Sequence, residues 1–200
     1  MKNALVFVGL GALVILIGVW IISTKPAEAP TIINSPENSM ANTLKLTSSV
    51  FENDASIPPR FTCDGGPPAG GMSPQLSWSG IPEGTKSLAL IMDDPDVPKQ
   101  LKPDGVFDHW TLFNIPPETA GIPEGGTIGM AGANGAGKST YTGPCPPPQY
   151  EPSEHRYYFR LYALDTILGL LEGASKAEVL AAMEGHVLAE AELVGKYKRQ

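Results

Sequence analysis

Acidic, imidazole and phenol side chains gather in a few short segments of this sequence, and their types suit a site for a small polar ligand. Asp94 directly precedes Pro95, and Asp96 lies two residues before Pro98, in the run Asp-Asp-Pro-Asp-Val-Pro. Because a residue before proline is pushed toward extended geometry, we expect both carboxylates to project to the same side. His155 and Tyr157 alternate along an apolar run and should share one strand face. His109 stands at the mouth of another apolar run.

These groups predict a pocket for a small anion of phosphate or carboxylate type. An aspartate beside a histidine favours the imidazolium, so His109 and His155 would donate charged hydrogen bonds while the aspartates orient them, and Tyr157 would donate through its hydroxyl. The segment 143–148, Gly-Pro-Cys-Pro-Pro-Pro, has φ fixed at four of its six positions and suits a rigid pocket wall. We expect a noncatalytic site with no metal and no cofactor.

Two other classes of function stay open at this point. One is a hydrolase with Cys145 as nucleophile and His155 or His109 as base, or a metal-dependent enzyme that uses two histidines and an aspartate. Cys145 stands between prolines without a basic neighbour to lower its pKa, which argues against a nucleophile. The other is a structural, partner-binding domain whose pocket is vestigial. Taken singly, the Asp-Pro-Asp run could be a turn and Tyr157 a core residue.

A phosphate-binding loop is matched by letter at residues 132–139, Gly-Ala-Asn-Gly-Ala-Gly-Lys-Ser. That motif functions between a buried strand and a helix whose N-terminal amides hold the phosphates. Residues 125–131 make a poor strand, and the prolines at 144–148 prevent a helix. We therefore interpret the segment as a glycine-rich surface loop rather than a nucleotide site.

The overall composition indicates one loop-rich β domain. The 200 residues carry a net charge of −7 with no basic patch, which excludes nucleic acid as a partner. Glycine and proline together are too frequent for a helix bundle. The sequence predicts a mainly β fold with one or two short helices, and the expected strands are Leu44–Phe51, Leu76–Trp78, Ser87–Asp93, His109–Ile115, His155–Leu164 and Val187–Tyr197.

Helices are predicted at two places. Ser175 and Glu178 form a capping box that opens a helix running to Glu184, with Gly185 as its stop. A second, weaker helical turn is expected near 165–171.

The N-terminal segment predicts a membrane connection. Residues 4–22 are uncharged and mostly apolar, and as a helix they would span about 28 Å, close to the thickness of a hydrocarbon core. We expect 1–23 to be a retained single-pass anchor with an extracytoplasmic domain; the alternative is a cleaved signal and a secreted or periplasmic protein. Residues 24–42 read as a flexible linker and 43–200 as the folded domain.

Several motifs in order resemble the phosphatidylethanolamine-binding proteins (PEBP family), and within it the bacterial and archaeal Raf kinase inhibitor-like members of the YbhB/YbcL type. The likeness covers roughly residues 43–197, and the motifs that carry it are Phe61-Thr-Cys-Asp-Gly, Ser73-Pro-Gln-Leu-Ser-Trp78, Asp94-Pro-Asp-Val-Pro98, His109-Trp-Thr-Leu-Phe-Asn-Ile-Pro116, Gly132-Ala-Asn-Gly, Tyr141-Thr-Gly-Pro-Cys-Pro-Pro147 and the run from His155 to Asp165.

The resemblance implies a large antiparallel sheet packed on a smaller one, with an anion pocket near strand ends. Carried over by residue, it implies a pocket lined by Asp94, Asp96, Pro98, His109, Gly143, Pro146, Pro147, His155 and Tyr157. It also implies a small anionic ligand and a kinase or protease as a protein target. The eukaryotic members close with an extra helix that is not matched after Tyr197, so we expect neither their phospholipid selectivity nor Raf binding.

The two cysteines have alternative states. In an oxidising compartment Cys63 and Cys145 could form a disulfide that closes a long loop, and in a reducing one both would be free thiols.

Overall fold

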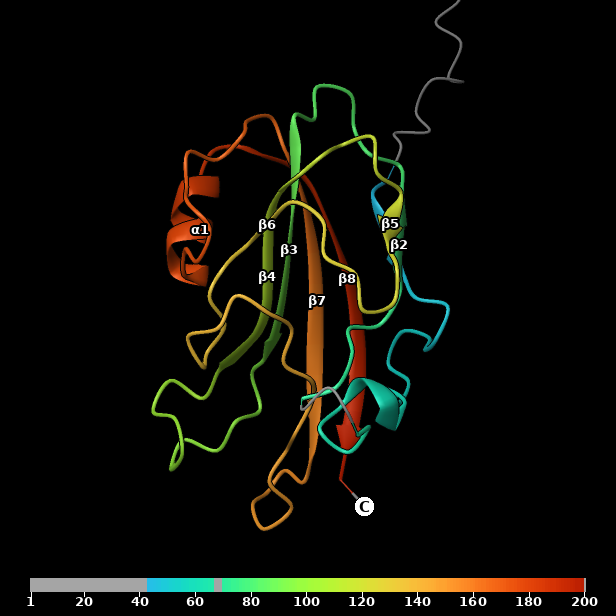
Figure 1. The fold of residues 1–200 in the computed structure, drawn as a ribbon, viewed down its shortest axis with the longest axis vertical. Helices are drawn as coiled ribbons and strands as arrows, with labels where there is room; N and C mark the ends of the chain where they lie inside the picture. The colour runs from blue at the N-terminus through green and yellow to red at the C-terminus, as the bar shows by residue number, and fades with distance from the viewer. Residues whose placement is uncertain (1–42, 67–69, 200) are drawn as a thin grey trace, which may run out of the picture. The chain divides into compact units, whose positions relative to one another are not determined.

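A computed structural model describes residues 43–66 and 70–199, which form two antiparallel sheets (Figure 1). The large sheet has the strand order β6-β4-β3-β7-β8, and the small sheet has the order β1-β2-β5. The large-sheet strands are β3 (Ser87–Asp94), β4 (Phe107–Ile115), β6 (Met130–Ala131), β7 (Glu154–Leu164) and β8 (Val187–Lys198). The small-sheet strands are β1 (Lys45–Thr47), β2 (Leu76–Ser79) and β5 (Gly121–Ile122).

The central strand β3 is buried on both faces, because the small sheet covers one face of the large sheet and the helix α1 (Lys176–Met183) covers the other (Figure 1). Leu88, Leu90 and Met92 belong to the core between the sheets. Ala89 and Ile91 belong to a second core, on the helix side. Successive side chains of a strand point to opposite faces, so an almost continuous apolar run supplies both cores.

The expected mainly β fold and all six expected strands are confirmed, with small shifts at their ends. The predicted strand Leu44–Phe51 is shorter, at Lys45–Thr47, and the two-residue strands β5 and β6 were not anticipated. Two residues offer no periodicity from which a strand can be recognised; β6 exists because it pairs with Leu112 and Phe113 of β4.

The helix α1 begins and ends as its capping residues predict. The Ser175 hydroxyl accepts from the Glu178 amide, and the Glu178 carboxylate accepts from the Ser175 amide at 2.8 Å. Val179 and Met183 then pack against the large sheet. The second helical turn, expected at 165–171, is wrong: this segment is a loop, and the Asn114 side chain bonds both the amide and the carbonyl of Leu168.

The glycine-rich match to a phosphate-binding loop adopts no strand–loop–helix geometry. The Asn134 carboxamide oxygen accepts from the amides of Ala136 and Lys138, and its nitrogen donates to the Thr140 carbonyl. A coil, not a helix, follows Lys138. The interpretation of this segment as a surface loop is therefore supported, because Asn134 accepts hydrogen bonds from the amides that a phosphate would otherwise bind.

The expected anchor, linker and start of the domain concern residues 1–42, which lie outside the described residues. Within 43–66 and 70–199 no helix is long and apolar enough to cross a membrane. The membrane segment at 4–22 stays a prediction.

A disulfide joins Cys63 to Cys145, with their Cα atoms 5.4 Å apart. The Cys63 amide also donates to the Pro144 carbonyl, at 3.0 Å. The two segments are 82 residues apart in sequence, so the bond closes a long loop and removes many conformations from the unfolded chain.

Replacing both cysteines with serine should lower the free energy of unfolding by roughly 2–5 kcal/mol, because the unfolded chain regains that freedom. Urea unfolding followed by circular dichroism measures the change. Reduced wild-type protein should match the double variant, whose own stability should not respond to reductant. Equal stabilities of the oxidised protein and the double variant would contradict the assignment.

Candidate functional site

A cavity of about 360 Å³ lies where β3 ends and where β4 and β7 begin. Six of the nine residues predicted for a ligand pocket line it: Asp94, His109, Gly143, Pro146, Pro147 and His155. The remaining lining residues are Val97, Leu101, Phe107, Thr142 and Cys145. Segments far apart in the sequence therefore meet here, as the sequence pattern indicated.

A buried aspartate–histidine pair forms the polar end of the cavity. The Nδ1 of His155 donates to Oδ2 of Asp94 at 2.7 Å, and the two residues are only 1% and 3% exposed. The other Asp94 oxygen accepts from the Asp96 amide at 2.8 Å. Both carboxylate oxygens are thus bonded, which fixes the carboxylate and, through it, the imidazole ring.

The pKa of His155 results from two opposing effects. Burial lowers it, but the hydrogen bond and the negative charge of Asp94 outweigh burial, and the pKa lies above the ordinary value for histidine. The cation therefore persists to a higher pH than in a free histidine. Its Nε2 is buried and has no hydrogen-bond partner within the described residues.

His109 is placed by a β-bulge. The register of β3 with β4 pairs Met92 with Trp110 and Asp93 with Asp108, so His109 is the extra residue between them. A bulge turns a side chain away from the direction that strict alternation would give it. His109 lines the cavity beside Phe107, with their ring centroids 4.8 Å apart.

His109 and His155 differ in electrostatic environment. The Nδ1 of His109 donates to the Thr142 carbonyl at 2.6 Å. Burial lowers the pKa of His109, whereas this hydrogen bond and the charge of Asp94 raise it. The effect of burial is the larger, so the pKa lies below the ordinary value for histidine. The pKa of His155 is thus raised and that of His109 lowered, because only His155 directly bonds a carboxylate; a donor role toward a ligand stays a prediction for both imidazoles.

Tyr157 lies next to the two histidines without lining the cavity. Its ring meets His109 edge to face at 5.2 Å and stacks with His155 at 6.5 Å. Burial, assisted by the charge of Asp94, raises the pKa of Tyr157. The hydroxyl is fully buried and has no partner in the described part of the chain. It stays protonated, and the Asp94 carboxylate, which contributes to its raised pKa, does not accept from it in normal hydrogen-bond geometry.

Asp96 and Pro98 are not among the cavity's lining residues. The Asp96 carboxylate instead accepts two hydrogen bonds from the Arg156 guanidinium, at 2.7 and 2.8 Å, which lower its pKa. The expectation that Asp94 and Asp96 project to the same side is wrong, since the chain turns at Pro95 and Asp96 and leaves extended geometry. A ligand role for Asp96 or Pro98 stays a prediction.

The proline-rich wall, residues 143–148, is held against Phe61 and Gly70. The Gly143 amide donates to the Gly70 carbonyl at 2.6 Å. A Cβ at position 143 would lie 2.4 Å from that oxygen and 2.5 Å from the Phe61 carbonyl oxygen, so only glycine fits here. The disulfide fixes the same wall two residues later, at Cys145.

The disulfide also bears on the hydrolase alternative. Both cysteines of the chain are bonded to each other, so Cys145 offers no thiolate nucleophile. Among residues 43–66 and 70–199, no group of three histidine, cysteine or acidic side chains could hold a metal ion. The described residues therefore do not supply the groups on which that alternative depended.

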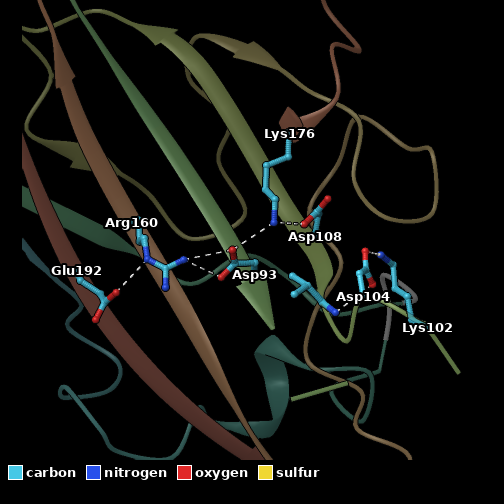
Figure 2. Close-up of polar contacts among 8 residues, drawn as sticks. Asp93, Lys102, Asp104, Asp108, Arg160, Lys176 and Glu192 are labelled. Atoms are coloured by element: carbon cyan, nitrogen blue, oxygen red, sulfur yellow. Dashed lines mark hydrogen bonds and ion pairs between the residues drawn. The ribbon is translucent and has the colours of Figure 1, made fainter. Parts of the chain in front are cut away.

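The apolar lining was largely missed from the sequence. Val97 and Leu101 come from the loop between β3 and β4, and Phe107 is the first residue of β4. Asp104 fixes that loop, because its carboxylate accepts from Lys102 at 2.6 Å and from the Val106 amide (Figure 2). Of these three residues, only Phe107 was predictable from the sequence. It lies two residues before His109, and residues two apart in a strand point to the same face.

Figure 2 shows an ion-pair network at the same strand ends. None of its residues lines the cavity. Asp93 of β3 and Asp108 of β4 are register partners, which places like charges opposite each other. Lys176, the first residue of α1, contacts both carboxylates. Arg160 of β7 joins Asp93 to Glu192 of β8. The network connects four neighbouring strands, β4, β3, β7 and β8, with the helix α1.

The family model of the phosphatidylethanolamine-binding proteins matches residues 47–198 of this chain. The chain belongs to this family. A UPF0098 protein of Methanothermobacter thermautotrophicus is 48% identical over 163 residues, covering 78% of this chain and 99% of the relative. A UPF0098 protein of Chlamydia muridarum is 45% identical over 157 residues, with coverages of 78% and 99%.

Solved structures of phosphatidylethanolamine-binding protein relatives show the same fold. The homologue CT736 from Chlamydia trachomatis matches with a TM-score of 0.73 and 42% identity, covering 80% of this chain and 99% of that one. Escherichia coli YbcL, described as a member of the mammalian PEBP family, matches with a TM-score of 0.67 and 30% identity, covering 78% and 99%. The chain is therefore similar to bacterial and archaeal members of the family, as its motifs indicated.

Replacing Asp94 with Asn should lower the pKa of His155, because burial then acts without the opposing carboxylate. In the wild type the pair stabilises the fold fully below about pH 6.5 and loses this contribution as pH rises through the raised pKa of His155. D94N should cost roughly 3 kcal/mol at pH 6 and flatten that pH dependence. Urea unfolding between pH 5 and 9 measures both effects.

The matched control is D165N, which removes the partner of the half-exposed His186. It should change stability by well under 1 kcal/mol and leave the pH dependence as in the wild type. A D94N variant that behaves like D165N would contradict the assigned role of the buried pair.

Proposed function

We propose that this chain is a noncatalytic binding module that holds a small phosphate-like or carboxylate-like anion in the cavity at the end of the large sheet. Membership of a family named for binding a phospholipid headgroup supports this proposal. The single observation that carries it is the unpartnered polar pair, His155 Nε2 and the Tyr157 hydroxyl, both buried beside the cavity.

Unpartnered buried donors are costly to a fold unless something else accepts their hydrogen bonds. When protonated, His155 Nε2 donates with a positive charge, and the Tyr157 hydroxyl donates without one. An oxyanion offers acceptors to both. The rest of the lining includes Val97, Leu101 and Phe107, which suit an organic group attached to the anion.

Titration calorimetry with inorganic phosphate, methyl phosphate and acetate tests the proposal on the full-length protein. At pH 6 at least one of these anions should bind, and its affinity should fall as pH rises through the raised pKa of His155. Methylammonium, a cation of similar size, should not bind. Absence of binding by all three anions at millimolar concentration would refute the proposal.

Replacing Tyr157 with Phe separates ligand binding from stability. The hydroxyl has no partner within the described residues, so its removal should leave the free energy of unfolding unchanged or slightly higher. If the hydroxyl donates to the anion, Y157F should weaken the binding of methyl phosphate about fivefold to tenfold. Calorimetry and thermal unfolding provide the two measurements.

The control for this variant is Y162F, on the same strand but packed against the helix-side core. It should not change the affinity for methyl phosphate. Unchanged affinity in Y157F would remove the tyrosine from the site, and a large loss of stability would show that its hydroxyl has a structural partner.

We further propose that residues 4–22 tether this module to a membrane, on the strength of their length and apolar character. The disulfide supports a domain on the oxidising side. After cell fractionation, the full chain should sediment with membranes and resist extraction by carbonate, whereas a variant that lacks residues 1–42 should not. A kinase or protease as target of inhibition stays a prediction from the family resemblance.

A further inference from the structure

β8 is the last strand of the large sheet, and the described residues bond to only part of its outer edge (Figure 1). On its inner side β8 pairs with β7. On its outer side, the Asp54 amide donates to the Val194 carbonyl and the Ile57 amide to the Lys196 carbonyl, both at 2.8 Å. Residues 54–57 therefore occupy the edge along the C-terminal half of β8.

Among the described residues, the outer edge has no such partner at 190–192, which we call the open edge. Every second residue of a strand turns its amide and carbonyl to the same side, so Glu190 and Glu192 present theirs in the direction that Val194 does. No hydrogen bond within residues 43–66 and 70–199 involves the amide or the carbonyl of Glu190 or Glu192. An edge with unpaired backbone groups is a template for a further strand.

A cavity of about 580 Å³ adjoins the open edge. Its apolar lining includes Leu44, Pro82, Leu188 and Ala189, and its charged lining residues are Glu83 and Glu190. Glu192 bonds Arg160, whereas neither glutamate of the cavity forms an ion pair with a described residue. An extended segment on the open edge would therefore meet apolar groups together with negative charge that no described residue neutralises.

These charges disfavour a second copy of this chain as the occupant of the open edge. In a symmetric antiparallel pairing of β8 with β8 of another molecule, the axis would pass at Glu190 or at Ala191. Glu190 would lie opposite Glu190 in the first case and opposite Glu192 in the second. Like charges directly opposite each other destabilise a strand pair, whereas lysine or arginine opposite the glutamates would stabilise it.

We propose that the open edge binds an extended peptide segment of a protein partner, in which basic and apolar side chains alternate. The segment adds a strand to β8, and its backbone bonds the amides and carbonyls of Glu190 and Glu192. Its basic side chains lie beside these glutamates, and its apolar side chains lie on the other face, toward Leu44 and Ala189.

This surface is separate from the anion cavity. That cavity is lined by His155 at the start of β7, whereas Glu190 is the register partner of Tyr162 near the end of β7. Binding of a peptide to the open edge therefore does not depend on the ligand of the cavity, and the two proposals can fail separately.

Amide hydrogen exchange, followed by NMR on the full-length protein, tests whether the edge is open and whether a peptide closes it. The amides of Glu190 and Glu192 should exchange fast, whereas that of Ala191, which points to β7, should exchange slowly. The peptide acetyl-Lys-Val-Lys-Val-Lys-Val-amide at millimolar concentration should slow exchange at Glu190 and Glu192 at least tenfold. Slow exchange without peptide would show an edge already covered by this chain or by a second copy, and would overturn the inference, as would no effect of the peptide.

Two methylated forms of the same peptide separate strand addition from attraction of charges. One carries N-methyl groups on the lysine amides and the other on the valine amides, so side chains and net charge are unchanged. Alternate amides of a strand point to opposite edges, so only one of the two sets faces β8. In titration calorimetry one form should bind at least tenfold more weakly than the unmodified peptide, and the other should bind like it. Equal affinities of the two methylated forms would overturn the inference.

Charge reversal locates the site on the protein. Glu190→Lys should weaken binding of the unmodified peptide at least tenfold. The matched control is Glu154→Lys, an exposed glutamate eight positions along β7 from Tyr162, or about 26 Å at 3.3 Å per residue. E154K changes the net charge equally and should keep the wild-type affinity within about twofold. Equal losses in both variants would overturn the assignment to the open edge, and the peptide series on the wild type stands even if E190K does not fold.

Discussion

Alternation of side chains along the β-strands is the constraint on which both faces of the large sheet depend. Asp93 and Asp94 are neighbours in sequence, yet Asp93 joins Arg160 and Lys176 on the helix side, whereas Asp94 bonds His155 in the cavity. β7 repeats the pattern, because Arg156 and Arg160 face one way and His155 and Tyr157 the other. One face of these strand ends thus carries a network of ion pairs, and on the other face His155 Nε2 and the Tyr157 hydroxyl have no hydrogen-bond partner among the described residues.

The ion-pair network on the helix side of the sheet holds together the strand ends that line the cavity. Asp93 and Asp108 would repel each other across β3 and β4, and Lys176 contacts both (Figure 2). The strand ends that carry Asp94 and His109 are therefore held together by the first residue of a helix with its own capping box. This arrangement keeps lysine and arginine out of the cavity lining, which leaves one histidine–carboxylate pair as its charged element.

Three features constrain the backbone of the proline-rich wall. Prolines fix its backbone angles, Gly143 allows a carbonyl contact that any side chain would block, and the disulfide joins it to Cys63. The cavity therefore lies between a constrained wall and the end of a sheet. The solved relatives show that this fold is shared by proteins of bacteria with 30–42% identity to this chain.

Local sequence determined the six longer expected strands and α1, because alternation and capping act over a few neighbouring residues. It also indicated which residues gather around the cavity, although for several of them only through resemblance to a family. Tertiary structure decided the rest. Asp96 pairs with Arg156, and a β-bulge sets the direction of the His109 side chain. The loop residues Val97 and Leu101 complete the lining of the cavity. Each of these outcomes depends on partners distant in sequence, and no local pattern encodes a hydrogen bond or a strand register formed across dozens of residues.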